Sequence, residues 1–154
     1  AKILCQQEKT KCIIIFGSNY PNELPDSSDV EIDNVICVKS IANKDFVSLV
    51  SAAKVCVISA GDTLLQCVAL HKIAVAAPVS PDQPARLKLC HNKKLVVSAK
   101  PESTDLVEQV QGVINMTSIE YQDFISNMKQ QTPLNALENI IEDIASLYVD
   151  NKSI

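Results

Sequence analysis

Glycine is scarce in this sequence. The 154 residues include only 3 glycines, whereas average usage predicts about eleven. The shortage excludes collagen-like and glycine-linker classes. It also excludes phosphate-binding loops that need several glycines, because neither G-x-G-x-x-G nor the Walker A pattern can be written here. The three that remain, Gly17, Gly61 and Gly112, therefore merit separate inspection.

An excess of positive charge and long apolar runs are also missing. The chain has 14 Lys and Arg against 18 Asp and Glu, a formal charge of −4, so non-specific nucleic-acid binding is not expected. We interpret the short basic cluster of Arg86, Lys88, Lys93 and Lys94 as a solvated face. No apolar run approaches the ~18 residues of a membrane span, and no signal peptide is recognised. We expect a cytoplasmic protein, free or peripheral to a membrane, without stable membrane insertion.

The cysteine pattern predicts neither a metal site nor disulfides. The 6 cysteines form no C-x-x-C motif, and no Cys/His cluster has the spacing of zinc ligands. Cys12, Cys37 and Cys56 lie in or beside β-branched runs, where a free cysteine behaves as a small buried hydrophobe. A chain of this length forms one domain with a sizeable core, so a disulfide framework is not needed. We expect reduced thiols throughout residues 1–154.

Short apolar runs alternate with longer amphipathic stretches. Strands are predicted at residues 12–16, 35–38, 55–58, 73–77 and 95–97. Helices are predicted at residues 43–53, 62–71, 84–91, 103–115, 118–130 and 134–148, with Asn43, Ser103 and Ser118 as N-caps. The runs are apolar at both alternate positions, which suits strands buried on both faces. The fold class is α/β: one Rossmann-like parallel sheet of about five or six strands, helices on both faces and extra C-terminal helices.

Two of the three glycines fall where predicted strands end. Open α/β sheets bind ligands beyond the carboxyl ends of their strands. Gly17 follows the first strand and Gly61 follows the third, and glycine permits positive φ and close approach of a ligand. The alternative is that both are simply tight turns.

The most informative segment is residues 59–66, SAGDTLLQ. A strand, a small turn and a helix N-terminus together form an anion site, because free backbone N–H groups and the positive end of the helix dipole face the ligand. Thr63 adds a hydroxyl, and Gln66, at i+3, faces the same way and can bind a sugar hydroxyl. Asp62 either points inward and repels a bound anion or caps its own helix.

Residues 54–86 resemble the nucleotide-sugar-binding signature of the C-terminal domains of GT-B glycosyltransferases. The nearest types are the peptidoglycan N-acetylglucosaminyltransferase and the UDP-sugar hydrolase of pseudaminic acid synthesis, often labelled spore-coat polysaccharide synthesis protein. Their pattern is an apolar strand, G-A-G-G-T-T-x-x-E, a small-residue helix, a second apolar strand ending in Pro, and N-Q. Here VCVI, SAGDTLLQ, IAVAAP and Asp82-Gln83 match it in order. The resemblance covers about residues 10–100.

The resemblance implies a surface for a UDP-sugar. Gly61 and Thr63 would hold the diphosphate, and Gln66 stands where the family has the Glu that binds ribose hydroxyls. The base would lie near Ile41. The full set of implied substrate-binding residues is Gly17, Ser18, Ile41, Ser59, Ala60, Gly61, Asp62, Thr63, Gln66, Asp82 and Gln83.

Within that set, Gly17 and Ser18 would line a cleft between two domains, and Asp82 and Gln83 would approach the sugar or phosphate. The chain departs from the family at several positions. Asp62 replaces a Gly, Gln66 replaces the Glu, His71 replaces a Gly and Ile73 replaces a frequent Pro.

No complete catalytic set is found in the sequence. His71 and His91 lie near predicted helix ends. A histidine there is more often a surface residue, or a cation that interacts favourably with the helix dipole, than a catalytic base. In the family the catalytic base belongs to the N-terminal domain. We therefore expect the nucleotide-sugar-binding C-terminal half of a longer enzyme, working with a missing N-terminal domain or a partner subunit and requiring no cofactor or metal.

The expected enzyme is a glycosyltransferase or a UDP-sugar hydrolase of surface-polysaccharide or nonulosonic-acid synthesis, and this chain alone would be inactive. Two alternatives remain. The chain is a non-catalytic or degenerate binding or assembly module, or it is a stand-alone subunit of a two-chain glycosyltransferase.

Overall fold

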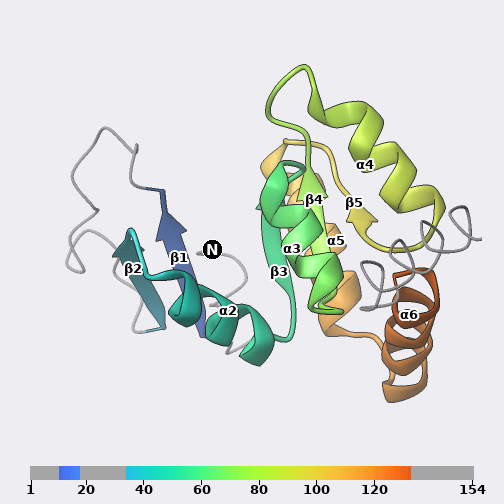
Figure 1. The fold of residues 1–154 in the computed structure, drawn as a ribbon. Helices are drawn as coiled ribbons and strands as arrows, with labels where there is room; N and C mark the ends of the chain where they lie inside the picture. Colours follow the sequence, from blue (N-terminus) through green and yellow to red (C-terminus); the bar gives the residue numbers. More distant parts are fainter. Residues whose placement is uncertain (1–10, 18–33, 133–154) are drawn as a thin grey trace, which may run out of the picture.

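The computed structural model describes residues 11–17 and 34–132, and strands and helices alternate along them (Figure 1). The elements are β1 (Cys12–Phe16), β2 (Val35–Lys39), α2 (Asn43–Ala52), β3 (Cys56–Ser59), α3 (Asp62–Ala69), β4 (Ala74–Ala77), α4 (Gln83–Asn92), β5 (Val97–Ser98), α5 (Ser103–Ile114) and α6 (Ser118–Gln131). The predicted α/β class with parallel strands is confirmed. The helix predicted at residues 134–148 lies outside the described residues.

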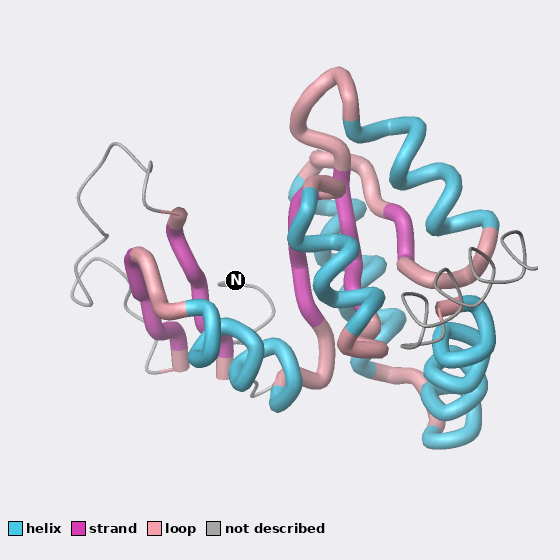
Figure 2. The backbone as a smooth tube through the Cα atoms, viewed as in Figure 1, coloured by secondary structure: helices cyan, strands magenta, loops and turns pink. Residues whose placement is uncertain are grey.

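The strands form two parallel sheets, so the prediction of one sheet of about five or six strands is wrong for the described residues. One sheet has the order β1-β2 and the other has the order β3-β4-β5. Figure 2 shows the two groups of strands apart from each other. The apolar runs identify each strand correctly, but they carry no information about which edge a strand pairs with. That choice depends on tertiary contacts.

The core lies on both faces of the three-stranded sheet. In the register of this sheet, Ala74 and Ala76 of β4 face the helices α3 and α4, while Ile73 and Val75 face α5. All four residues of β4 are buried. Met128 of α6 closes the first of these two clusters and is fully buried. Helices thus cover both faces of this sheet, as predicted.

The two-stranded sheet is less covered than its larger neighbour. No residue of β1 or β2 is fully buried, and Ile13, Ile15 and Ile36 are 43%, 37% and 53% exposed. Val57 on β3 is 52% exposed.

Among the described helices, none is long and apolar enough to cross a membrane.

The helix starts differ slightly from the prediction. The N-caps are Ala42, Glu102 and Thr117, each one residue before the residue expected. Only Thr117 caps with its side chain among these three. Its hydroxyl oxygen accepts a hydrogen bond from the Glu120 N–H at 3.3 Å, and the Glu120 carboxylate accepts one from the Thr117 N–H at 2.8 Å. This reciprocal capping box fixes the start of α6.

Two helices end in a left-handed residue that is not glycine. After α3, His71 has a φ of 51° and its backbone N–H donates to Val68 O, while the backbone N–H of Lys72 donates to Cys67 O. After α4, Lys94 has a φ of 54° and repeats the same pair of bonds to the last turn of its helix. Both are Schellman motifs, in which glycine is usual because a Cβ is unfavourable at positive φ. His71 therefore adopts a conformation that glycine would adopt more easily.

Replacing Lys94 with Gly should raise the free energy of unfolding by about 0.5–1 kcal/mol, since relief of the left-handed strain exceeds the added backbone entropy of the unfolded chain. Lys93→Gly is the matched control. Lys93 has a φ of −85°, so this variant should lose about 0.5–1 kcal/mol. Urea denaturation of both variants measures the difference, and equal losses in the two would contradict the strain at Lys94.

Replacing Gly112 with Ala should stabilise the protein by about 0.8–1 kcal/mol, because glycine disfavours a helix interior. Gly112 lies inside α5, and a Cβ added there meets no atom within 4 Å. Thermal unfolding followed by circular dichroism would detect the higher Tm. A lower Tm would show that something in the folded protein requires the bare backbone at this position.

Candidate functional site

The end of β3 leads directly into the N-terminus of α3. Ala60 is fully buried, and its N–H donates to Ala77 O at 3.0 Å, so the chain stays paired with β4 until it turns. Gly61 is the N-cap of α3, and no side chain caps the first turn of the helix in the described residues. Uncapped amides at a helix N-terminus can bind an anion. The predicted strand–turn–helix arrangement is present.

Gly61 adopts a backbone conformation open to any residue. Its φ is −85°, so the positive φ that glycine permits is not used here. A Cβ on Gly61 would lie 3.5 Å from Ser59 Oγ and 3.6 Å from Gln83 Nε2, which are ordinary contacts. What glycine provides here is close access to the backbone.

Gln83 brings the exit of β4 to the exit of β3. It is 8% exposed, and its Oε1 accepts the Val79 N–H at 2.9 Å, which closes the loop between β4 and α4. Its Nε2 points to the neighbourhood of Gly61. The structure therefore places Gln83 beside Gly61. Because the side chain also closes its own loop, it is held in a fixed position.

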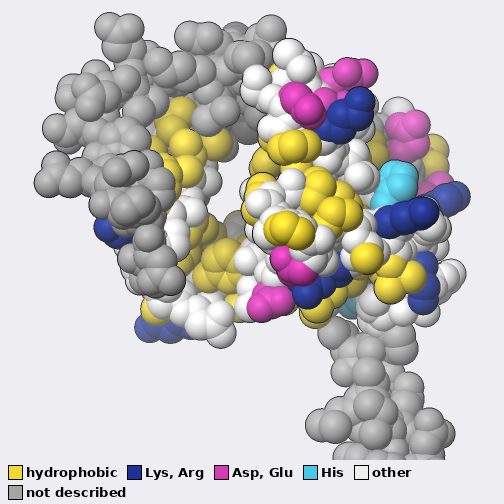
Figure 3. Space-filling model, turned by 90° about the horizontal axis from the view of Figure 1, so that it is seen from above, with side chains coloured by type: hydrophobic (Ala, Val, Ile, Leu, Met, Phe, Trp, Pro, Cys, Tyr) yellow, Lys and Arg dark blue, Asp and Glu magenta, His cyan; other side chains and the backbone are white. Residues whose placement is uncertain are grey.

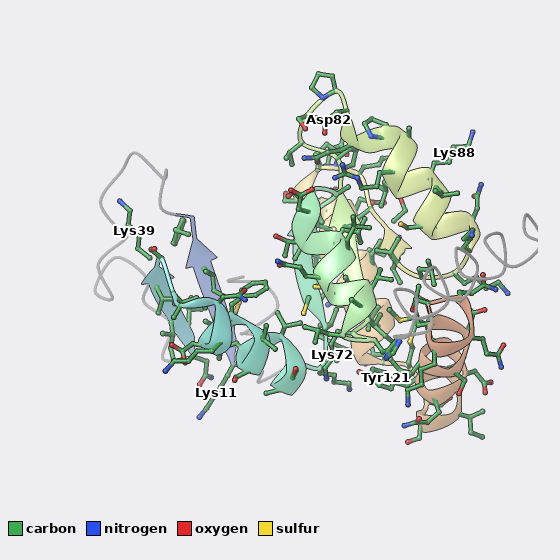
Figure 4. All side chains as sticks on the ribbon, viewed as in Figure 1. Lys11, Lys39, Lys72, Asp82, Lys88 and Tyr121 are labelled. Carbon is green, nitrogen blue, oxygen red and sulfur yellow. The ribbon has the colours of Figure 1, made fainter. Side chains whose placement is uncertain are left out.

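Asp82 lies at the tip of the same loop (Figure 4). Its Oδ1 accepts the Ser80 hydroxyl at 2.6 Å. This bond, together with the backbone N–H of Asp82 and the nearby Arg86, lowers the pKa of the Asp82 carboxyl. Asp82 is exposed and its described hydrogen bond is local, so it shapes the loop beside the site.

Arg86 lies at the same end of the sheet, although its sequence context suggested a solvated basic face. One guanidinium nitrogen donates to Ala60 O at 3.3 Å and lies 3.5 Å from Asp62 Oδ1. The Arg86 side chain is 33% exposed and that of Asp62 is 95% exposed. Arg86 thus brings a positive charge to the start of α3. The other three members of the basic cluster are exposed, as predicted.

The structure excludes one of the two interpretations of Asp62. Asp62 is the first residue of α3 and makes no capping bond, so it is not the N-cap that one interpretation required. Its carboxylate points outward toward Arg86. Seen from above the strand ends in Figure 3, acidic and basic side chains lie side by side. An exposed pair of this kind contributes about 0–1 kcal/mol to stability.

The remaining predicted residues divide between the two sheets. Thr63 is partly buried and Gln66 is exposed on α3. Gly17 follows β1, and Ile41 follows β2 after a bond from Ser40 N–H to Phe16 O at 3.0 Å. The structure does not pair the sheet that carries Gly17 and Ile41 with the sheet that carries Gly61. Ser18 lies outside the described residues.

The histidines lie away from this site. His71 Nε2 is 3.4 Å from Thr132 O, and His91 Nδ1 is 3.4 Å from Val96 O, both at helix ends. Among the described residues, no group of three or more His, Cys, Asp or Glu is placed to hold a metal. A hollow of 330 Å³ lies elsewhere, on the α5 side, where Gly112 and Met116 contribute to its lining.

Sequence reasoning missed Arg86 at the site. Arg86 is three residues beyond Gln83 in α4, so both side chains can lie on one face of that helix. That spacing was the available signal. It was overlooked because Arg86 was grouped with the lysines that follow it as one solvated basic face.

Comparisons with known proteins find similarity among solved structures. No family model matches the sequence, and no curated protein matches it. Among solved structures, the chain is similar to the glycotransferase of kitacinnamycin, known from its crystal structure. The two share 15% identity with a TM-score of 0.49, over 86% of this chain and 43% of that protein. This chain thus spans less than half of that protein's length.

Proposed function

We propose that this chain binds the diphosphate of a nucleotide sugar, such as a UDP-sugar, at the carboxyl ends of β3 and β4. The observation that carries the proposal is the start of α3, whose amides lack a side-chain cap and lie beside the Arg86 guanidinium. Amides at a helix N-terminus and a planar guanidinium are both well suited to phosphate oxygens. The resemblance of residues 54–86 to the nucleotide-sugar signature supports the same site.

The expected chemistry needs no metal, because amides and Arg86 can balance the charge of a diphosphate. When a sugar–phosphate bond breaks, negative charge grows on the leaving diphosphate, and fixed donors stabilise it. The acceptor and the base would come from a missing N-terminal domain or from a partner subunit. The reaction is then glycosyl transfer or hydrolysis, within a GT-B-type enzyme of surface-polysaccharide or nonulosonic-acid synthesis.

A second candidate is a degenerate module that has lost nucleotide affinity. The ion pair favours it, because Asp62 already offers Arg86 a carboxylate. A diphosphate would have to compete with Asp62 for the guanidinium, and the two anions would repel each other. Such a module would serve binding or assembly. The stand-alone subunit of a two-chain glycosyltransferase is a separate alternative, in which the chain keeps its nucleotide affinity but depends on another chain.

Calorimetric titration of the full chain with UDP and UDP-GlcNAc separates these functions. We expect binding by both, with UMP weaker because it lacks the second phosphate. Arg86→Gln should weaken UDP binding at least 10-fold, since charge-assisted hydrogen bonds contribute about 1.5–3 kcal/mol. Lys88→Gln is the matched control, because it removes the same charge from an exposed position of the same helix.

Absence of binding at millimolar UDP would exclude the donor site and leave the degenerate module. Equal weakening by Arg86→Gln and Lys88→Gln would show that only net charge matters. Thr63→Val should also weaken UDP binding, by about 1 kcal/mol if its hydroxyl bonds a phosphate.

Asp62→Asn tests the competition within the ion pair. This variant keeps the shape of the side chain and removes its charge, so UDP affinity should rise several-fold. The gain should shrink at high salt, because exposed charges are screened. Unchanged affinity at low salt would show that the Asp62 carboxylate does not compete with the ligand.

A further inference from the structure

Cys56 and Cys67 are held together by the turn between α3 and β4. The N–H of Cys56, at the start of β3, donates to Ile73 O at 3.1 Å. The N–H of Lys72 donates to Cys67 O at 2.9 Å. Two consecutive residues of one turn therefore fix the backbones of both cysteines. Cys67 is fully buried, and Cys56 is partly buried against the same apolar cluster.

The two thiols lie in one apolar cluster and differ in character. The thiol of Cys67 donates a hydrogen bond to the sulfur of Cys56, which lowers the pKa of Cys56. The same bond, with burial, raises the pKa of Cys67, so Cys67 keeps its proton. Cys56 is the more accessible partner and the one that ionises first. Nucleophilic and resolving thiols show this asymmetry in redox proteins.

Three titratable groups face Cys56, each from a different element. Cys67 faces it from α3, and Lys72 from the turn, where its positive charge also lowers the pKa of Cys56. Tyr121 faces it from α6, and burial together with the charge of Cys56 raises the pKa of this phenol. Figure 4 shows Lys72 and Tyr121 at the same end of the three-stranded sheet. Hydrogen bonds position both groups: the Lys72 ammonium donates to Ala53 O at 3.0 Å and the Tyr121 hydroxyl donates to Lys54 O at 3.3 Å.

We propose that Cys56 and Cys67 form a reversible disulfide when the protein meets a peroxide. The Cys56 thiolate attacks one oxygen of hydrogen peroxide; an S–O bond forms, the O–O bond breaks, and the departing hydroxide takes a proton to become water. Cys67 then loses its proton and attacks the Cys56 sulfur; the S–S bond forms, and the S–O bond breaks to release a second water. Two thiols are oxidised and one peroxide is reduced to two waters.

Peptide mapping of the wild-type chain tests the proposal directly. Trypsin cleaves after Lys54 and Lys72, so one peptide, residues 55–72, contains both cysteines. After stoichiometric hydrogen peroxide and blocking with N-ethylmaleimide, this peptide should lack two hydrogens and carry no maleimide. Dithiothreitol before blocking should restore two maleimides. Two maleimides on residues 55–72 after peroxide, while other cysteines oxidise, would overturn the proposal.

Single variants separate the two roles. Cys67→Ser should stop at a sulfenic acid on Cys56 that dimedone traps, and Cys56→Ser should leave Cys67 reduced. Cys37→Ser, a partly buried strand cysteine outside the pair, is the matched control and should keep the disulfide. Dimedone labelling of Cys67 in Cys56→Ser at the wild-type rate would contradict the assigned roles. The wild-type peptide map decides the proposal even where a core variant fails to fold.

Discussion

The burial of β4 is the constraint on which the rest of the structure depends. Its four residues are buried, and its backbone pairs with β3 on one edge and with β5 on the other. Three of the four side chains are alanine, so helices can pack closely on either face. This packing places the N-termini of α3 and α4 side by side at the strand ends. Gln83 and Arg86 reach the end of β3 only because α4 lies there.

The sequence predicts the elements better than their assembly. Hydrophobic periodicity locates the described strands and helices to within about two residues, because burial imposes that periodicity. Apolar runs alone do not show whether β1 pairs with β3. The prediction of a single sheet was wrong for that reason. Gln83 is a candidate from the sequence because it ends a strand–loop motif. The positions of Arg86, Cys56 and Cys67 relative to other elements depend on tertiary packing, which local spacing does not encode.

The shortage of glycine is visible in the backbone. All three residues with positive φ in the described chain are side-chain-bearing: Ser40, His71 and Lys94. Two of them end helices at positions that glycine usually occupies. The glycines that the chain does have lie elsewhere, and one of them, Gly61, leaves backbone amides open at the candidate site. The chain therefore tolerates strain at two of its helix ends, while Gly61 lies at the candidate site.

The unequal burial of the two sheets has a consequence for motion. Backbone amides of β4 open to solvent only when helices on both faces separate from the sheet, so their hydrogen exchange reports global unfolding. Amides of β1 and β2 lie in a sheet whose isoleucines are largely exposed, and they can exchange through smaller openings. The part of the chain that carries Gly17 and Ile41 can thus change conformation while the sheet that carries Gly61 stays folded.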